Sequence, residues 1–160
     1  MTVPYSLLGA ASVFFGAWSA RRALCHGEDA TGAQIRGYLT LLETIRHGIA
    51  YDRAPLCEIL DGCPRPLLSA CAGHPVTHAE DLEALAQETH FHSAALAAVV
   101  GEAAARLGRG YREEQVKACD RYVAEIAALA EAHEKRRRER NGTVSTLLYA
   151  AAAAAVLLLL

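Results

Sequence analysis

Charged side chains are missing from both ends of this 160-residue chain. The first 20 residues and the last 20 contain no Asp, Glu, Lys or Arg, so all 16 basic and 18 acidic residues lie between Arg21 and Arg140. One soluble domain of average composition does not explain such a distribution. The chain divides instead into two apolar ends and a charged middle segment, which at about 120 residues has the size of one domain.

The chain also lacks a surplus of charge of one sign, and its cysteines are sparse. A net charge of −2 gives no reason to expect a nucleic-acid partner. Five cysteines are too few for a secreted disulfide scaffold of this length. No stretch alternates between apolar and polar residues as a half-buried strand does, so we expect an all-α fold.

Sequence signatures of catalysis are missing as well. The chain contains no Gly-x-Ser-x-Gly turn for a nucleophilic serine. Gly108-Arg109-Gly110 is not followed by the pattern of a phosphate-binding loop. An enzymatic hypothesis is thus left without candidate residues, and we predict no catalytic residues and no cofactor.

The two apolar ends predict two transmembrane helices, within residues 1–20 and 143–160. Val3–Ala20 and Thr143–Leu160 are each 18 residues long, and as helices they would span about 27 Å, close to the hydrocarbon thickness of a bilayer. A cleaved signal peptide is the alternative for the first, since small residues precede Arg21. The basic residues follow this apolar segment instead of preceding it, which favours a retained anchor.

Basic residues flank the middle segment on both sides. By the positive-inside rule they place residues 21–142 in the cytoplasm, both ends of the sequence outside, and the protein in the cell membrane. Contact with anionic lipid headgroups also accounts for them. The flanking residues are Arg21, Arg22, Lys135, Arg136, Arg137 and Arg138.

Small residues recur at intervals of four in both apolar ends. Such faces allow membrane helices to pack closely, which leaves open a homo-oligomer. They are Ser12, Gly16 and Ala20 in the first segment and Thr146, Ala150 and Ala154 in the second.

Apolar residues spaced three and four apart predict helices throughout the middle segment. The first is expected over residues 28–50, and short helices over 55–60 and 66–72. A helix through Leu96 and Val99 should end at Gly108 and pack as an antiparallel hairpin against a long helix that begins at Tyr111. The apolar seam of the long helix comprises Val116, Cys119, Val123, Ile126, Ala130 and His133, and only Asn141-Gly142 interrupts it before the second apolar end.

An acidic stretch lies within the middle segment. Residues 54–105 contain seven acidic residues and one basic residue. A helix over residues 78–88, with Thr77 as N-cap and Glu80 in a capping box, would carry the four candidate docking residues for a basic partner. These are Glu80, Asp81, Glu83 and Glu88; ordinary solvated surface is the alternative.

Cysteine and histidine cluster between residues 57 and 78, which raises a second functional hypothesis. The cluster comprises Cys57, Cys63, Cys71, His74 and His78. Zinc sites usually pair ligands at tight spacing, and only Cys71 and His74 have that spacing, so we predict no metal ligands. A membrane-tethered metal or redox sensor is kept as the alternative function, and metal analysis of the purified domain would distinguish it.

Two stretches of the chain resemble stage III sporulation protein AB of endospore-forming bacteria. The first is Leu41–Leu60, with Leu42–Ile45 followed by Pro55-Leu56. The second is Ala105–Ile126, with the Leu107-Gly108 turn and the helix start at Tyr111–Gln115. The order of anchor, two arginines, helical domain and apolar C-terminal segment is also similar. The Asp that the family has at position 111 is replaced by Tyr.

The resemblance implies a non-catalytic scaffold in the sporulation apparatus that joins the mother cell and the forespore across their envelope. It implies a cytoplasmic domain on the mother-cell side, similar to the helical F-type domain of the type II secretion platform. The expected partners are other stage III sporulation membrane proteins, a secretion-type ATPase and the lipid bilayer.

Overall fold

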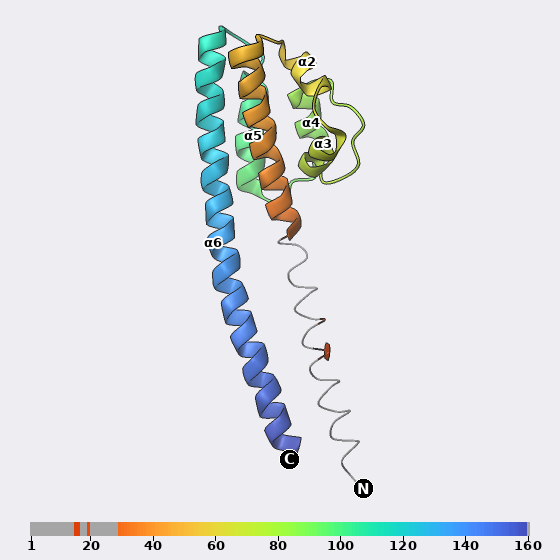
Figure 1. Ribbon diagram of the computed structural model, residues 1–160, viewed down its shortest axis with the longest axis vertical. Coiled ribbons are helices and arrows are strands. Elements are labelled where there is room, and N and C mark those ends of the chain that lie inside the picture. The colour runs from red at the N-terminus through yellow and green to blue at the C-terminus, as the bar shows by residue number, and fades with distance from the viewer. Residues whose placement is uncertain (1–14, 17–18, 20–28, 160) are drawn as a thin grey trace. The chain divides into compact units, whose positions relative to one another are not determined.

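All regular structure in the part of the chain that this computed structural model describes is helical, which confirms the all-α prediction. The described residues are 15–16, 19 and 29–159. Figure 1 shows the long helix α6 and the group of short helices α2, α3 and α4. In chain order the elements are a helix over residues 29–47, a π-helical turn η1 (Gly48–Asp52), α2 (Leu56–Asp61), α3 (Arg65–Ala72), α4 (Leu82–Glu88), α5 (Ala94–Arg106) and α6 (Arg112–Leu159).

The chain forms two compact units. One comprises Met1–Asp29 together with Glu134–Leu160, and the other comprises Ala30–His133. The second unit, here called the helical domain, contains the buried core.

The first apolar segment, Val3–Ala20, lies outside the described residues except for positions 15, 16 and 19, and Arg21 and Arg22 lie outside them too. Across the described residues, no helix combines the length and the apolar character that a membrane crossing requires. Helix α6 continues through Asn141-Gly142 to Leu159, so this dipeptide does not end the helix.

The helix over residues 29–47 supplies one side of the core. The predicted apolar face is buried, including Tyr38, Leu42 and Ile45, and Leu41 is buried beside it. The helix then widens into η1, and the chain reverses at Arg53, which has a positive φ of 56°. Such a conformation is uncommon for a residue other than glycine, and it ends the helix as a left-handed cap does.

Helices α5 and α6 form the antiparallel hairpin that the sequence predicted. The connection contains Gly108 and Gly110, whose φ values of 84° and 106° suit glycine. Cys119 and Ile126 of the predicted seam are fully buried, whereas Val116, Val123 and Ala130 are half-buried. Tyr122, which the sequence analysis did not place in the seam, is also buried. Its hydroxyl donates a hydrogen bond to the backbone oxygen of Glu102 at 3.4 Å.

The predicted cap at Thr77 is wrong. Helix α4 begins at Leu82, and the Asp81 side chain accepts a hydrogen bond of 2.6 Å from the backbone N–H of Ala84. Val76 and Ala79 are buried and hold the preceding chain against the core, so the helix starts only after them. Thr77 and Glu80 therefore lie exposed in a loop, while α2 and α3 each begin within one residue of the predicted position.

An acid-dependent loss of stability is expected from the α5–α6 hairpin. Arg121 donates a hydrogen bond of 2.5 Å to Glu102, and this bond and the Arg121 charge lower the pKa of Glu102 below its ordinary value of 4.5. A carboxyl whose pKa is lowered by folding stabilises the fold above its unfolded-state pKa, and the stabilisation is lost as the pH falls through the folded-state value. Melting temperatures measured downward from pH 6 should therefore fall less steeply for Glu102→Gln than for the wild type. Equal slopes would contradict the prediction.

Candidate functional site

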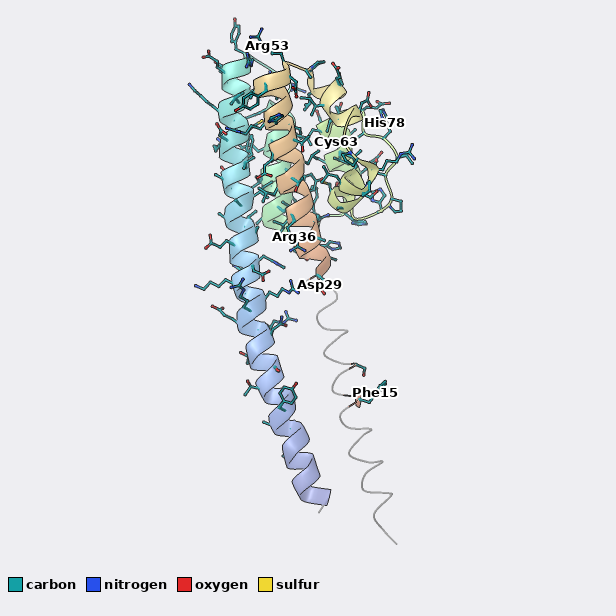
Figure 2. All side chains as sticks on the ribbon, viewed as in Figure 1. Phe15, Asp29, Arg36, Arg53, Cys63 and His78 are labelled. Atoms are coloured by element: carbon teal, nitrogen blue, oxygen red, sulfur yellow. The ribbon has the colours of Figure 1, made fainter. Side chains whose placement is uncertain are left out.

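A surface pocket of the helical domain lies where its loops converge. It has a volume of about 630 Å³ and is lined by residues 53–57, 81–83 and 107–110, together with Ile49, Ala104, Arg112 and Gln115. We call it the loop pocket. Figure 1 shows the chain reversal after η1 and the α5–α6 connection at the same end of the helical domain, and Figure 2 labels Arg53 there.

Close packing between η1 and α2 lies next in the chain to residues that line this pocket. A Cβ atom added to Gly48 would lie 2.6 Å from Cδ1 of buried Ile59, so the Ile59 side chain would have to shift to admit it. Glycine at this position therefore lets η1 approach α2. The close approach precedes the reversal at Arg53, from which the pocket wall continues through Pro55 to Cys57.

Arg112 joins the α6 end of the pocket to the end of the first helix. Its Nε donates a hydrogen bond of 3.0 Å to the backbone oxygen of Ile49, and its Nη2 donates one to that of Ala50. These carbonyls lie at the C-terminal end of a helix, where no intrahelical donor is left for them. The guanidinium thus closes the helix end, and its positive charge is paired with neutral carbonyl groups.

The remaining charges of the pocket differ in how they are engaged. Arg109 lies 3.7 Å from a carboxylate oxygen of Glu83, and both side chains are more than half exposed. Asp81 is committed to the cap of α4. The guanidinium of Arg53 forms no hydrogen bond or ion pair with any residue that the structure describes. Arg53 is thus the cation available to a ligand, and Arg109 becomes available when its exposed ion pair exchanges.

Two exposed tyrosines lie beside residues of the pocket in the sequence. Tyr51 is 69% exposed and Tyr111 is 81% exposed, and they are the large apolar side chains that stand out as exposed within the described helical domain. The Tyr51 ring lies 4.7 Å from that of His47. Exposed tyrosine and arginine are the residue types that dominate binding energy at protein interfaces, so this end of the domain has the composition of a binding surface.

The structure separates the four candidate docking residues into two pairs. Asp81 and Glu83 line the loop pocket and are engaged by Ala84 and Arg109. Glu80 and Glu88 are exposed and have no ion pair within the described part of the chain. The two unpaired residues are the ones whose charge a basic partner could neutralise.

Of the predicted membrane-flanking residues, those on α6 are described. Lys135, Arg136 and Arg138 are exposed. Arg137 is half-buried and forms an ion pair of 3.1 Å with Asp29, and both residues belong to the same compact unit. Arg138 lies 3.4 Å from Glu134 on its own helix.

The cysteine and histidine cluster is dispersed. Cys63 and Cys71 are buried, whereas Cys57 is exposed. The Nδ1 atom of exposed His74 lies 3.3 Å from the backbone oxygen of Ala72. The Nδ1 atom of exposed His78 lies 3.0 Å from a carboxylate oxygen of Asp61. Within the described residues, no three His, Cys, Asp or Glu side chains are placed to hold a metal ion together.

Burial also changes the chemistry of the thiols. It raises the pKa of Cys71 to about 12 and the pKa of Cys119 to about 11. These groups are therefore protonated at neutral pH, and the thiol is a poor nucleophile and metal ligand. The positions of the described cysteines and histidines give the metal or redox alternative no support.

Sequence reasoning missed Arg53, Arg109 and Arg112 as a group. Arg53 lies between the helices expected over residues 28–50 and 55–60, and Arg109 and Arg112 lie beside the expected helix end at Gly108. Their convergence was not visible, because Arg112 contacts a carbonyl 63 residues away in the sequence.

Comparisons of the chain with models of known protein families, with curated proteins and with solved structures find no match. The resemblance to the sporulation family therefore depends on the two stretches and the layout of this sequence alone.

Proposed function

We propose that this protein is a non-catalytic membrane scaffold of the sporulation apparatus that links mother cell and forespore. Its helical domain would serve as a platform that gathers a secretion-type ATPase and other stage III sporulation membrane proteins. The observation that supports this proposal is which parts of the chain form the loop pocket. The pocket residues 53–57 come from one of the two family-like stretches, and residues 107–110, 112 and 115 come from the other. Both stretches therefore contribute to one surface with the composition of a binding site.

The membrane part of the proposal rests on the sequence. Residues 1–20 and 143–160 would form transmembrane helices, and residues 21–142 would be the cytoplasmic domain, with the basic residues at the inner leaflet. Exposure of Lys135, Arg136 and Arg138 is compatible with contact to lipid headgroups.

Cysteine labelling tests this topology. Cys57 is exposed in the fold, so protection of this thiol in intact cells would reflect the membrane and not burial. In a Cys25→Ser background, an impermeant maleimide should label Thr2→Cys in intact cells and should label Cys57 only after permeabilisation. Labelling of Cys57 in intact cells, or protection of Thr2→Cys, would refute the orientation.

Docking of a basic partner is proposed on the acidic residues before and on α4. Electrostatic steering acts mainly on the rate at which two proteins associate. Glu80 and Glu88 can steer a basic partner because they form no ion pair within the described part of the chain. Glu80→Lys combined with Glu88→Lys should leave the melting temperature within about 2 °C, as expected of surface changes. It should reduce recovery of the ATPase from sporulating cells and lower the yield of spores.

A matched control is Glu131→Lys, an exposed reversal on α6. It should recover the ATPase like the wild type. Adding Glu83→Lys should cost further stability, since Glu83 pairs with Arg109. Normal sporulation and normal recovery with the Glu80 and Glu88 reversals would mean that these residues are ordinary solvated surface.

A further inference from the structure

We infer that the loop pocket binds an acidic and apolar peptide segment of a partner protein, with Arg53 and Arg109 receiving its carboxylates. This binding chemistry is opposite to that of the acidic docking face on α4. It does not depend on the proposed sporulation function, because it follows from the charges and the lining of the pocket.

The charged residues that line the pocket favour the binding of an anion. Three arginines and two carboxylates line it, and the carboxylates are already engaged, Asp81 by the cap of α4 and Glu83 by Arg109. Arg53 has no partner within the described residues, and Arg112 has only neutral carbonyl partners. An incoming carboxylate would therefore meet uncompensated positive charge.

Replacing Glu83 with a ligand carboxylate as the partner of Arg109 would cost little free energy. The two groups are 3.7 Å apart, and their side chains are 75% and 53% exposed. Exposed ion pairs of this kind contribute little to stability. A ligand carboxylate can thus replace Glu83 at Arg109 while the backbone stays in place, and arginine can hold a carboxylate through two parallel hydrogen bonds.

The apolar lining requires more than a small anion. Ile49, Leu82 and Leu107 line the pocket but are themselves buried, so exposed Pro55 and half-buried Leu56 present its apolar surface. Its volume of about 630 Å³ falls within the range of ligand sites, about 300–1,000 Å³. Phosphate alone would leave Pro55 and Leu56 in water, whereas a leucine or phenylalanine beside a carboxylate would cover them.

The test uses the full-length chain in detergent micelles and a fluorescent peptide of alternating Glu and Leu residues. We expect saturable binding that weakens with salt. Arg53→Asn combined with Arg109→Gln should weaken it about tenfold, because each exposed charge contributes modestly. Asparagine tolerates the positive φ at position 53. Arg109→Lys in place of Arg109→Gln should restore part of the affinity.

Arg65→Gln is the matched control, since it removes an exposed positive charge that is outside the pocket lining. It should bind the peptide within about twofold of the wild type, as expected of a distant surface charge. In a Cys25→Ser background, bound peptide should also slow alkylation of Cys57, which lines the pocket and is exposed.

Three results would overturn the inference. A Lys and Leu peptide that binds equally well would show that the pocket does not select for acid. Displacement of the peptide by millimolar inorganic phosphate would show a simple anion site. Equal binding by the double variant and by Arg65→Gln, with Cys57 unprotected, would place the peptide elsewhere. Melting of each variant verifies that it is folded.

Discussion

Truncation of Ile126 to Ala is expected to lower the free energy of unfolding by about 2–5 kcal/mol, the range for removing a buried aliphatic side chain. Ile126 is fully buried on α6 and belongs to the same core cluster as Leu96 of α5. The loss combines the transfer free energy of the deleted methyl and methylene groups with the cavity that remains. Urea unfolding of the full-length chain in detergent micelles, followed by circular dichroism, measures it.

Val123→Ala is the control for this change on the same helix. Val123 is only partly buried, and valine loses fewer atoms than isoleucine, so the cost should be clearly smaller. A change within about 0.5 kcal/mol for Ile126→Ala, the range of surface positions, would mean that this seam faces solvent. A larger loss for Val123→Ala than for Ile126→Ala would mean that the burial of the two positions is reversed.

Replacement of Gln34 by Met should cost about 3 kcal/mol, although it keeps an unbranched side chain of similar length. Gln34 is 1% exposed. Its Nε2 donates hydrogen bonds of 3.0 Å to the backbone oxygens of Cys71 and His90, and its Oε1 accepts one of 3.1 Å from the backbone N–H of His92. Three backbone groups would lose their partner, and each buried unsatisfied group costs about 1–3 kcal/mol, less where water can reach it.

Gln115→Met makes the same chemical change at an exposed hydrogen bond. Gln115 donates one bond of 2.9 Å to the backbone oxygen of Gly110, and water can replace it there. We expect a loss of less than about 1 kcal/mol, the net value of an ordinary hydrogen bond. If the two variants unfold at the same urea concentration, the Gln34 bonds do not hold the first helix to α3 and to the α4–α5 connection.

The helices themselves followed from local sequence. The spacing of Tyr38, Leu42 and Ile45 fixes which face of the first helix is apolar, because residues three and four apart project from the same side of a helix. Proline at position 55 and glycines at 108 and 110 place the breaks, because backbone conformation at these residues is a local property. The all-α fold and the α5–α6 hairpin were predictable for this reason.

Local sequence did not determine the cap of α4 or the polar centre of the core. Thr77 and Asp81 are both good caps, and burial of Val76 and Ala79 selects Asp81. The sequence around Gln34 gives no sign that it is buried, since its partners lie 37 to 58 residues away.

Like the cap of α4 and the burial of Gln34, the loop pocket depends on tertiary structure. The sequence by itself determined the helices, their apolar faces and the uncharged ends, because each depends on neighbours within a few turns. Only the packed domain brings Arg53, Arg109 and Arg112 to one pocket and leaves Arg53 without a partner among the described residues. The physical reason is that an ion pair or a pocket depends on distances between chain segments, which packing of the whole core sets.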